Sequence, residues 1–226
     1  INNTLSNQKG SVDKTTLCTL FANYLEKKKK KVLVIDCDVQ QTISFRRKAD
    51  LQKYKDATIP YNIQPFNIAN VQNVQSLMTN LRKMQGIILI DAPGNLTQQG
   101  LIPIFANSDY IICPFQYEVT SINATATFIS FIYKIRVKLS KNVAQLFLVD
   151  NSHDKRFGKK EELELWSMTE KRFSEYGQVT PMVEYRAEMR RYTTLYLMKT
   201  QETIISPAFD FIYNHIFIKE ENDGKE

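Results

Sequence analysis

The stretch SNQKGSVDKTT, residues Ser6–Thr16, lies between a short extended N-terminus and an amphipathic helical pattern. A lysine followed by a hydroxyl residue at such a junction, as in Lys14-Thr15, is typical of a phosphate-binding loop. In these loops the backbone N–H groups and the N-terminus of the following helix cradle phosphate oxygens. The lysine adds a positive charge, and the hydroxyl can bind Mg²⁺. This stretch therefore predicts a phosphate site at the first junction with a helix.

Strand and helix patterns alternate along the rest of the chain. Continuous apolar runs, which are typical of strands buried on both faces, occur at Val32–Ile35, Ile87–Ile90, Tyr110–Cys113 and Leu146–Val149. Helical patterns occur at Thr15–Glu26, Val71–Met84, Val119–Leu139 and Glu161–Tyr176. Such alternation predicts right-handed crossovers and an α/β fold with a mostly parallel central sheet and helices on both faces. We expect a single domain over residues 1–218 and a polar C-terminal tail over residues 219–226.

Composition narrows the class of protein. Hydrophobic residues make up 43% of the 226 residues, which predicts a packed globule rather than a disordered chain. The three cysteines, Cys18, Cys37 and Cys113, lack metal-ligand spacing and are expected to be buried, reduced thiols. No apolar run approaches the roughly 18–20 residues that span a bilayer, and the N-terminal residues lack a signal-peptide pattern. We therefore expect a cytoplasmic protein that does not bind membranes.

Carboxylates follow two of the predicted strands. Asp36 and Asp38 come after the run Val32–Ile35, and Asp91 comes after Ile87–Ile90. Ligands of parallel sheets bind at the carboxyl ends of strands. Beside a phosphate loop, one carboxylate can hold Mg²⁺ and another can orient an attacking water. The alternative is an ordinary solvated loop or turn after each strand.

Three motifs in this order resemble the ParA/MinD family of ATPases. Lys9 and Lys14 are similar to the two lysines of its deviant Walker A box, K-G-G-x-G-K-T-[ST]. The segment Asp36–Gln40, followed by Ser44, resembles the D-x-D-P-Q motif of the family, with Val39 in place of the proline. Asp91-Ala92-Pro93-Gly94 resembles its Walker B form. The resemblance implies a P-loop NTPase fold that binds ATP and Mg²⁺.

The resemblance also implies a role for each matching residue. Lys14 would hold the β- and γ-phosphates, Lys9 would reach the nucleotide of a second subunit, and Asp38 would orient the attacking water. The metal would be held by Thr15, Asp36 and Asp91. The nucleotide would be bound by Gly10, Ser11, Val12, Asp13, Lys14, Thr15 and Thr16, with Asn151 against the adenine.

Two loop residues depart from the family. Ser11 and Asp13 stand where the family has glycine, and a non-glycine residue at positive φ costs about 1–2 kcal/mol. A carboxylate about 5 Å from a phosphate repels it by roughly 3 kcal/mol at an effective dielectric near 20. An alternative to a working ATPase is therefore a scaffold that keeps the fold and binds a partner without hydrolysing ATP. A further alternative is that the two substitutions were introduced to trap a state.

The family suggests partners as well. Its members form an ATP-dependent homodimer, respond to a partner protein that stimulates hydrolysis, and in DNA-binding relatives contact phosphates through a basic surface. Here the net charge is +6, and Arg186, Arg190 and Arg191 follow a strand-like Pro181–Val183. Non-specific DNA binding and an ordinary solvated helix face both fit these arginines. For the aromatic segment Phe209–Ile218, we expect a helix packed on the sheet rather than the membrane helix of MinD-like relatives.

Overall fold

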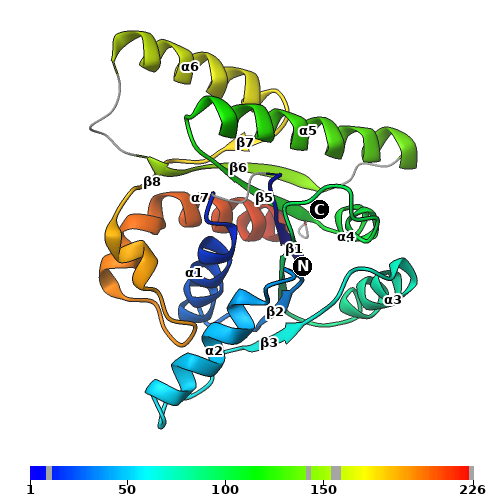
Figure 1. Ribbon diagram of the computed structural model, residues 1–226, viewed down its shortest axis with the longest axis vertical. Coiled ribbons are helices and arrows are strands. Elements are labelled where there is room, and N and C mark those ends of the chain that lie inside the picture. Colours follow the sequence, from blue (N-terminus) through cyan, green and yellow to red (C-terminus); the bar gives the residue numbers. More distant parts are fainter. Residues whose placement is uncertain (9–11, 141–143, 154–158, 224–226) are drawn as a thin grey trace.

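The computed structural model describes residues 1–8, 12–140, 144–153 and 159–223, and side chains as far as residue 217 (Figure 1). Its strands are β1 (Asn2–Leu5), β2 (Val32–Asp36), β3 (Asn62–Pro65), β4 (Ile87–Asp91), β5 (Tyr110–Phe115), β6 (Gln145–His153), β7 (Gln178–Val179) and β8 (Val183–Glu184). Its helices are α1 (Lys14–Lys27), α2 (Thr42–Lys53), α3 (Val71–Leu81), α4 (Leu101–Ala106), α5 (Val119–Leu139), α6 (Lys160–Ser174), the 3₁₀ helix η1 (Ala187–Arg191) and α7 (Lys199–Asp223).

The strands form one sheet in which every described pair is parallel. Their order is β3-β2-β4-β1-β5-β6-β7, and β8 also pairs with β6. The first strand therefore lies in the centre, between β4 and β5. The carboxyl ends of β1, β2 and β4 meet at one edge of the sheet, as the sequence predicts for the loop and its carboxylates.

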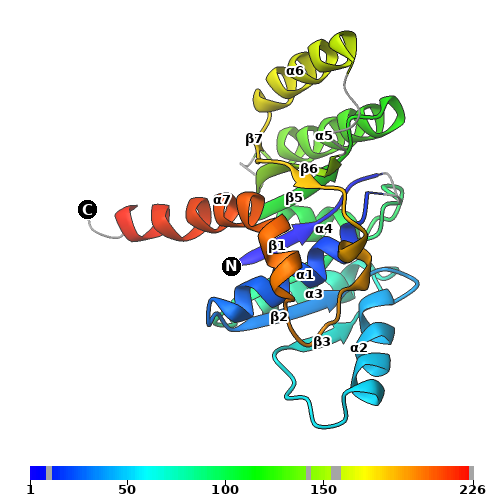
Figure 2. The ribbon, with the colours of Figure 1, turned by 90° about the vertical axis from the view of Figure 1, so that its left-hand side faces the viewer.

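Helices cover both faces of the sheet (Figures 1 and 2). One apolar core lies under α1 and α7, with Leu20, Phe21 and Phe209 among its buried side chains. The other lies under α3, α4, α5 and α6 and includes Phe105 and Phe128. The predicted α/β class with a parallel sheet is confirmed. No helix in the described part of the chain is long and apolar enough to cross a membrane.

The helix bounds follow the predicted patterns with small shifts. α5 has the predicted bounds, but α3 ends at Leu81 rather than Met84, because the next residues form only turns. In α7, Phe209, Ile212 and Ile216 are buried in the core, which confirms the helix packed on the sheet. This helix continues to Asp223, beyond the predicted domain end at residue 218. All three cysteines are buried and free, as expected.

Candidate functional site

The loop between β1 and α1 is anchored at its start by the neighbouring strand. Ser6 donates its backbone N–H to the carbonyl of Ile112 at 3.1 Å. The Asn7 amide donates to the carbonyl of Pro114 at 2.7 Å and to the Thr125 hydroxyl at 2.9 Å. Lys9, Gly10 and Ser11 lie outside the described residues, so their assigned roles stay predictions.

Asp13, the last residue of the loop, has a left-handed backbone conformation, which is the conformation that glycine adopts most readily. Asp13 has φ 56° and ψ 36°, immediately before the first residue of α1. Its carboxylate accepts a hydrogen bond of 3.3 Å from the Ser152 hydroxyl, and the Asn151 amide donates to the Val12 carbonyl at 3.1 Å. The end of β6 thus holds the loop in place. The amide nitrogen of Asn151 contacts loop backbone, and its contact with adenine stays a prediction.

Lys14 and Asp91 place opposite charges in the interior beside this loop. Lys14 is 6% exposed and Asp91 is 1% exposed. Burial lowers the pKa of Lys14, and the nearby charge of Asp91 acts against that shift. Burial raises the pKa of Asp91 to about 7, although the Thr15 hydroxyl donates to its Oδ2 at 2.8 Å. Thr15 and Asp91, both predicted metal ligands, therefore lie in contact.

Asp36 lies next to Asp91, because the two residues are register partners on adjacent strands. Its Oδ2 accepts hydrogen bonds from the backbone and hydroxyl of Ser44, at 2.9 and 2.8 Å. Within the described residues, the Oδ1 atoms of Asp36 and Asp91 are buried and have no hydrogen-bond partner. Such oxygens are costly in a protein interior unless a ligand reaches them.

These residues fit a magnesium ion. Mg²⁺ takes oxygen ligands and is commonly bound by one or two carboxylates together with substrate phosphates. The described residues contain no group of three or more histidine, cysteine, aspartate or glutamate side chains that could hold a metal alone. A metal at Asp36 and Asp91 would therefore depend on Thr15, water or a phosphate for its remaining ligands.

Asp38 occupies the turn after β2. It is partly exposed, its Oδ1 accepts from the backbone N–H of Gln40 at 2.9 Å, and its negative charge acts on Lys14. The side chain thus lies within electrostatic reach of the phosphate loop without being buried. Its assigned role with the attacking water stays a prediction.

The turn after Asp91 packs directly against the phosphate loop. A Cβ atom added to Gly94 would lie 2.9 Å from the carbonyl oxygen of Gln8 and 3.1 Å from that of Asn7. It would also lie 3.4 Å from Nζ of Lys14. This close approach requires glycine at residue 94. The sequence analysis named Ser44 as part of a motif without giving it a role. It did not find Ser152, because the contact of Ser152 with Asp13 spans 139 residues of the chain.

The arginines after β8 differ from their expected arrangement. Residues Ala187–Arg191 form a short 3₁₀ helix, so the α-helix on which Arg186 and Arg190 would share one face does not form. Arg186 pairs with Glu184 at 3.0 Å. Arg186 and Arg190 line a small cavity beside the loop together with Asp13 and Ser152. These side chains therefore border the phosphate loop.

A family model decides the relationship. The CobQ/CobB/MinD/ParA nucleotide binding domain matches residues 4–190. The chain belongs to this family. A search of curated proteins finds no match. The family model spans the loop, both strand-end carboxylates and Asn151, so the predicted resemblance is confirmed.

Several solved structures have the same fold as this protein over nearly its whole length. Apo McdA from Cyanothece is 15% identical, with a TM-score of 0.75, and the match covers 95% of this chain and 98% of McdA. A plasmid partition protein from Borrelia burgdorferi is 18% identical, with a TM-score of 0.67 and the same coverage, 95% and 98%. Cobyrinic acid a,c-diamide synthase from Mycobacterium smegmatis, with a bound ATP analogue and magnesium, is 17% identical, with a TM-score of 0.72 and coverage of 96% and 95%.

Proposed function

We propose that this protein is a ParA-like Mg²⁺-ATP switch that acts in the partitioning or maintenance of a DNA element. The observation that carries the proposal is the pair of buried carboxylates beside the buried Lys14: Asp36 and Asp91 each have one oxygen without a hydrogen-bond partner among the described residues. A cation would give both carboxylate oxygens a partner, and a phosphate chain would lie beside the positive charge of Lys14. Membership of the family and the similarity to partition proteins support the same assignment.

The proposed roles come from the family resemblance, and the contact of Thr15 with Asp91 and the pairing of Asp36 with Asp91 support them. Lys14 would bind the terminal phosphates, while Thr15, Asp36 and Asp91 would hold Mg²⁺. The metal would neutralise phosphate charge, and phosphoryl transfer depends mainly on such neutralisation and on positioning. Asp38, at the edge of the site, would orient the attacking water.

The switch would work through association of two subunits. ATP would promote a face-to-face homodimer in which Lys9 of each subunit reaches the nucleotide of the other. The dimer would bind DNA without reading its sequence, and a partner protein would stimulate hydrolysis. Hydrolysis would then return the monomer and release the DNA.

Calorimetric titration with Mg²⁺-ATP tests the nucleotide site. We expect saturable binding that Lys14→Ala weakens at least about tenfold, because a charge-assisted contact to phosphate is lost. Lys83→Ala is the matched control, since it removes one exposed lysine remote from the loop. Equal affinity of wild type and Lys14→Ala, or no binding at all, would contradict the proposal.

The alternative scaffold function is favoured by Asp13. This residue keeps a strained left-handed backbone and brings a carboxylate to the loop. A scaffold would bind nucleotide weakly or not at all and would show no turnover. Measuring phosphate release alongside the titration separates the two functions, because binding without turnover favours the scaffold.

DNA binding is tested by a salt series on a random-sequence duplex, with and without Mg²⁺-ATP. Contacts to phosphates release counterions, so the affinity should fall steeply as salt rises. The switch predicts tighter binding with Mg²⁺-ATP, whereas the scaffold predicts none or binding indifferent to nucleotide. A flat salt response would remove DNA from the proposed function.

A further inference from the structure

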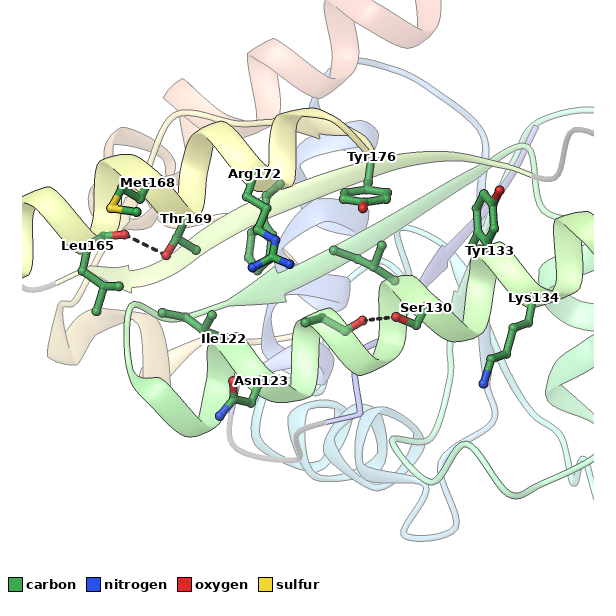
Figure 3. A pocket seen from close by; sticks show the side chains of 13 residues that line it. Ile122, Asn123, Ser130, Tyr133, Lys134, Leu165, Met168, Thr169, Arg172 and Tyr176 are labelled. Carbon is green, nitrogen blue, oxygen red and sulfur yellow. Dashed lines mark hydrogen bonds between the residues drawn. The ribbon is translucent and has the colours of Figure 1, made fainter.

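A groove runs between α5 and α6, on the helical layer that covers the β5–β6–β7 half of the sheet (Figure 3). Its volume is about 770 Å³. Apolar and aromatic side chains from both helices and from the turn after α6 line it, among them Ile122, Tyr133, Leu165, Met168 and Tyr176. None of the lining residues belongs to the phosphate loop or to the carboxylate pair. The groove is therefore separate from the nucleotide site.

The apolar side chains of this groove are unusually exposed. Met168 is 70% exposed and Tyr133 is 57% exposed, while Leu165 and Tyr176 are 46% and 45% exposed. Beneath them, Ile129 and Phe173 are buried and form part of the core. A contiguous apolar surface with a well-packed floor is typical of a protein interaction site.

The charged side chains that line the groove among the described residues are positive. Lys134 and Arg172 line it, and Arg172 reaches from α6 towards α5 (Figure 3), whereas no carboxylate of the described part of the chain lines it. Among the described residues, neither cation has an ion pair or hydrogen bond. The groove thus offers positive charge at the end towards the C-termini of both helices. A ligand that fits it would carry carboxylates there.

The hydroxyl groups of the groove do not need a ligand. Ser130 donates to the Ala126 carbonyl at 2.9 Å, and Thr169 donates to the Leu165 carbonyl at 2.8 Å. Both bonds stay within one helix and are visible in Figure 3. The remaining chemistry of the groove is therefore apolar contact plus positive charge.

We propose that this groove binds an amphipathic helix of a partner protein, with apolar residues facing the groove and acidic residues over Lys134 and Arg172. The lining from Ile122 to Tyr133 spans about three helical turns at roughly 1.5 Å per residue. A helix laid in such a groove would contact it through residues at i, i+4 and i+7. A second copy that presents the same face is a poorer occupant, because Lys134 and Arg172 of the two copies would then face one another.

The probes are two stapled helical peptides of about 14 residues, each three to four turns long. Both carry leucine at i, i+4 and i+7, and they differ only in a C-terminal cluster of glutamates or of lysines. Binding is followed by anisotropy of a labelled peptide and by the emission of Trp166, the single tryptophan, which lies on α6 and stacks on Tyr117. We expect the acidic peptide to bind at least about tenfold more tightly than the basic one.

Variants locate the binding and test the charge. Met168→Glu should weaken the acidic peptide about tenfold or more, and Arg172→Glu should remove the preference between the peptides, because the new carboxylate offsets the charge of Lys134. Ile59→Glu is the matched control, because Ile59 is 52% exposed and lies outside the groove. Unchanged melting temperatures would show that Met168→Glu and Arg172→Glu remain folded.

Several results would overturn this inference. They are equal binding of the two peptides, binding of neither, or no effect of Met168→Glu. A dimer without nucleotide that Met168→Glu dissociates would instead make this face a contact between copies of the chain. Because the groove and the phosphate loop share no residue, each of these outcomes leaves the calorimetric test of nucleotide binding independent.

Discussion

Two groups of buried charges in this protein differ in how completely they are hydrogen-bonded. At the carboxyl edge of the sheet, Asp36 and Asp91 each keep one oxygen without a partner among the described residues. Beneath the segment that precedes α7, Arg47 and Asp50 of α2 have no buried side-chain atom without a hydrogen-bond partner among the described residues. Arg47 donates to the Thr194 hydroxyl, the Thr194 carbonyl and the Tyr61 carbonyl, at 2.8, 2.9 and 2.8 Å.

In the second network, Thr194 is hydrogen-bonded to both Arg47 and Asp50. Asp50 accepts from the backbone N–H and the hydroxyl of Thr194, at 2.7 and 2.8 Å. These bonds fix α2 against residues 192–196 without a ligand. The difference teaches that burial alone does not identify a functional charge. A satisfied network indicates a structural role, and an unsatisfied oxygen in a polar cluster indicates a ligand.

The largest expected effect lies in the satisfied network. Arg47→Met should lower the free energy of unfolding by about 3–5 kcal/mol, because it leaves the Thr194 and Tyr61 acceptors buried without a donor. Urea denaturation measures the change, and Lys48→Met, at an exposed neighbouring position of α2, is the control. A loss below about 1 kcal/mol would mean that the network has no structural role.

Asp38 tests the proposed ligand site at the carboxyl edge of the sheet. Asp38→Ala should reduce ATP turnover by about 10²-fold or more, because loss of a group that positions the reactive water has effects of that order. Nucleotide affinity and stability should change little, since the side chain is partly exposed. Phosphate release and calorimetry on the same preparation measure both. Equal turnover would assign the water to another residue.

Asp150 combines features of both groups. One oxygen contacts Nδ1 of His153 at 2.8 Å, and the other is buried without a partner among the described residues. Burial raises the pKa of Asp150 to about 6, while the neighbouring His153 lowers it and the charge of Glu170 raises it. Tyr117 also packs against His153. A carboxyl group with a raised pKa in the folded state binds its proton more tightly there than in the unfolded chain.

The protonated Asp150 should therefore stabilise the fold fully below the pKa of the unfolded chain, near 4. This stabilisation should be lost as the pH rises through the folded-state pKa of about 6. Between pH 4 and pH 8 wild type should lose about 2 kcal/mol relative to Asp150→Asn, at 1.36 kcal/mol per pKa unit. Denaturant midpoints at both pH values measure this, with Glu26→Gln as an exposed control. An identical pH dependence of wild type and Asp150→Asn would contradict the assignment.

The sequence predicted the first group of charges because its signals are local. Aliphatic runs mark β2 and β4, and the aspartates follow directly, so topology alone brings Asp36 and Asp91 together. The second group has no local signal. α2 buries only Ile43, Arg47 and Asp50, which gives no apolar periodicity. Thr194, which accepts two of the hydrogen bonds of Arg47, lies 147 residues away in the chain.

Other elements were missed for related reasons. β3 is an edge strand with mostly exposed residues, and α4 is only six residues long, so neither has a clear hydrophobic pattern. In the site, the positive φ at Asp13 could be foreseen from the family glycine. Its contact with Ser152 could not, because that contact joins residues 139 positions apart in the chain.

Asp13 should have a smaller effect on nucleotide binding. Asp13→Gly should strengthen Mg²⁺-ATP binding about tenfold, because it removes a carboxylate beside the phosphate site and relaxes a left-handed backbone. Asp13→Asn separates the two causes, since asparagine is neutral and tolerates this conformation. If calorimetry gives the same affinity for wild type and Asp13→Gly, the carboxylate directed at Ser152 does not oppose phosphate.

The smallest expected effect concerns an unsatisfied group that no ligand reaches. Asn3 is fully buried in β1, between its register partners Leu89 and Tyr110. Neither its amide nitrogen nor its oxygen has a hydrogen-bond partner among the described residues. Unlike Asp36 and Asp91, it lies in the middle of a strand rather than at its carboxyl end. Its unpaired amide should therefore only cost stability.

Asn3→Val should raise the free energy of unfolding by about 1 kcal/mol, because it removes this unpaired amide and places a β-branched side chain in a buried strand. Asn2→Val is the control. Asn2 donates its amide to the Asn107 carbonyl at 3.4 Å, so its replacement should gain less or lose stability. Urea denaturation at neutral pH measures both variants. If Asn3→Val instead destabilises by more than about 1 kcal/mol, a buried water satisfies the Asn3 amide, and its unpaired atoms belong with the ligand-binding group.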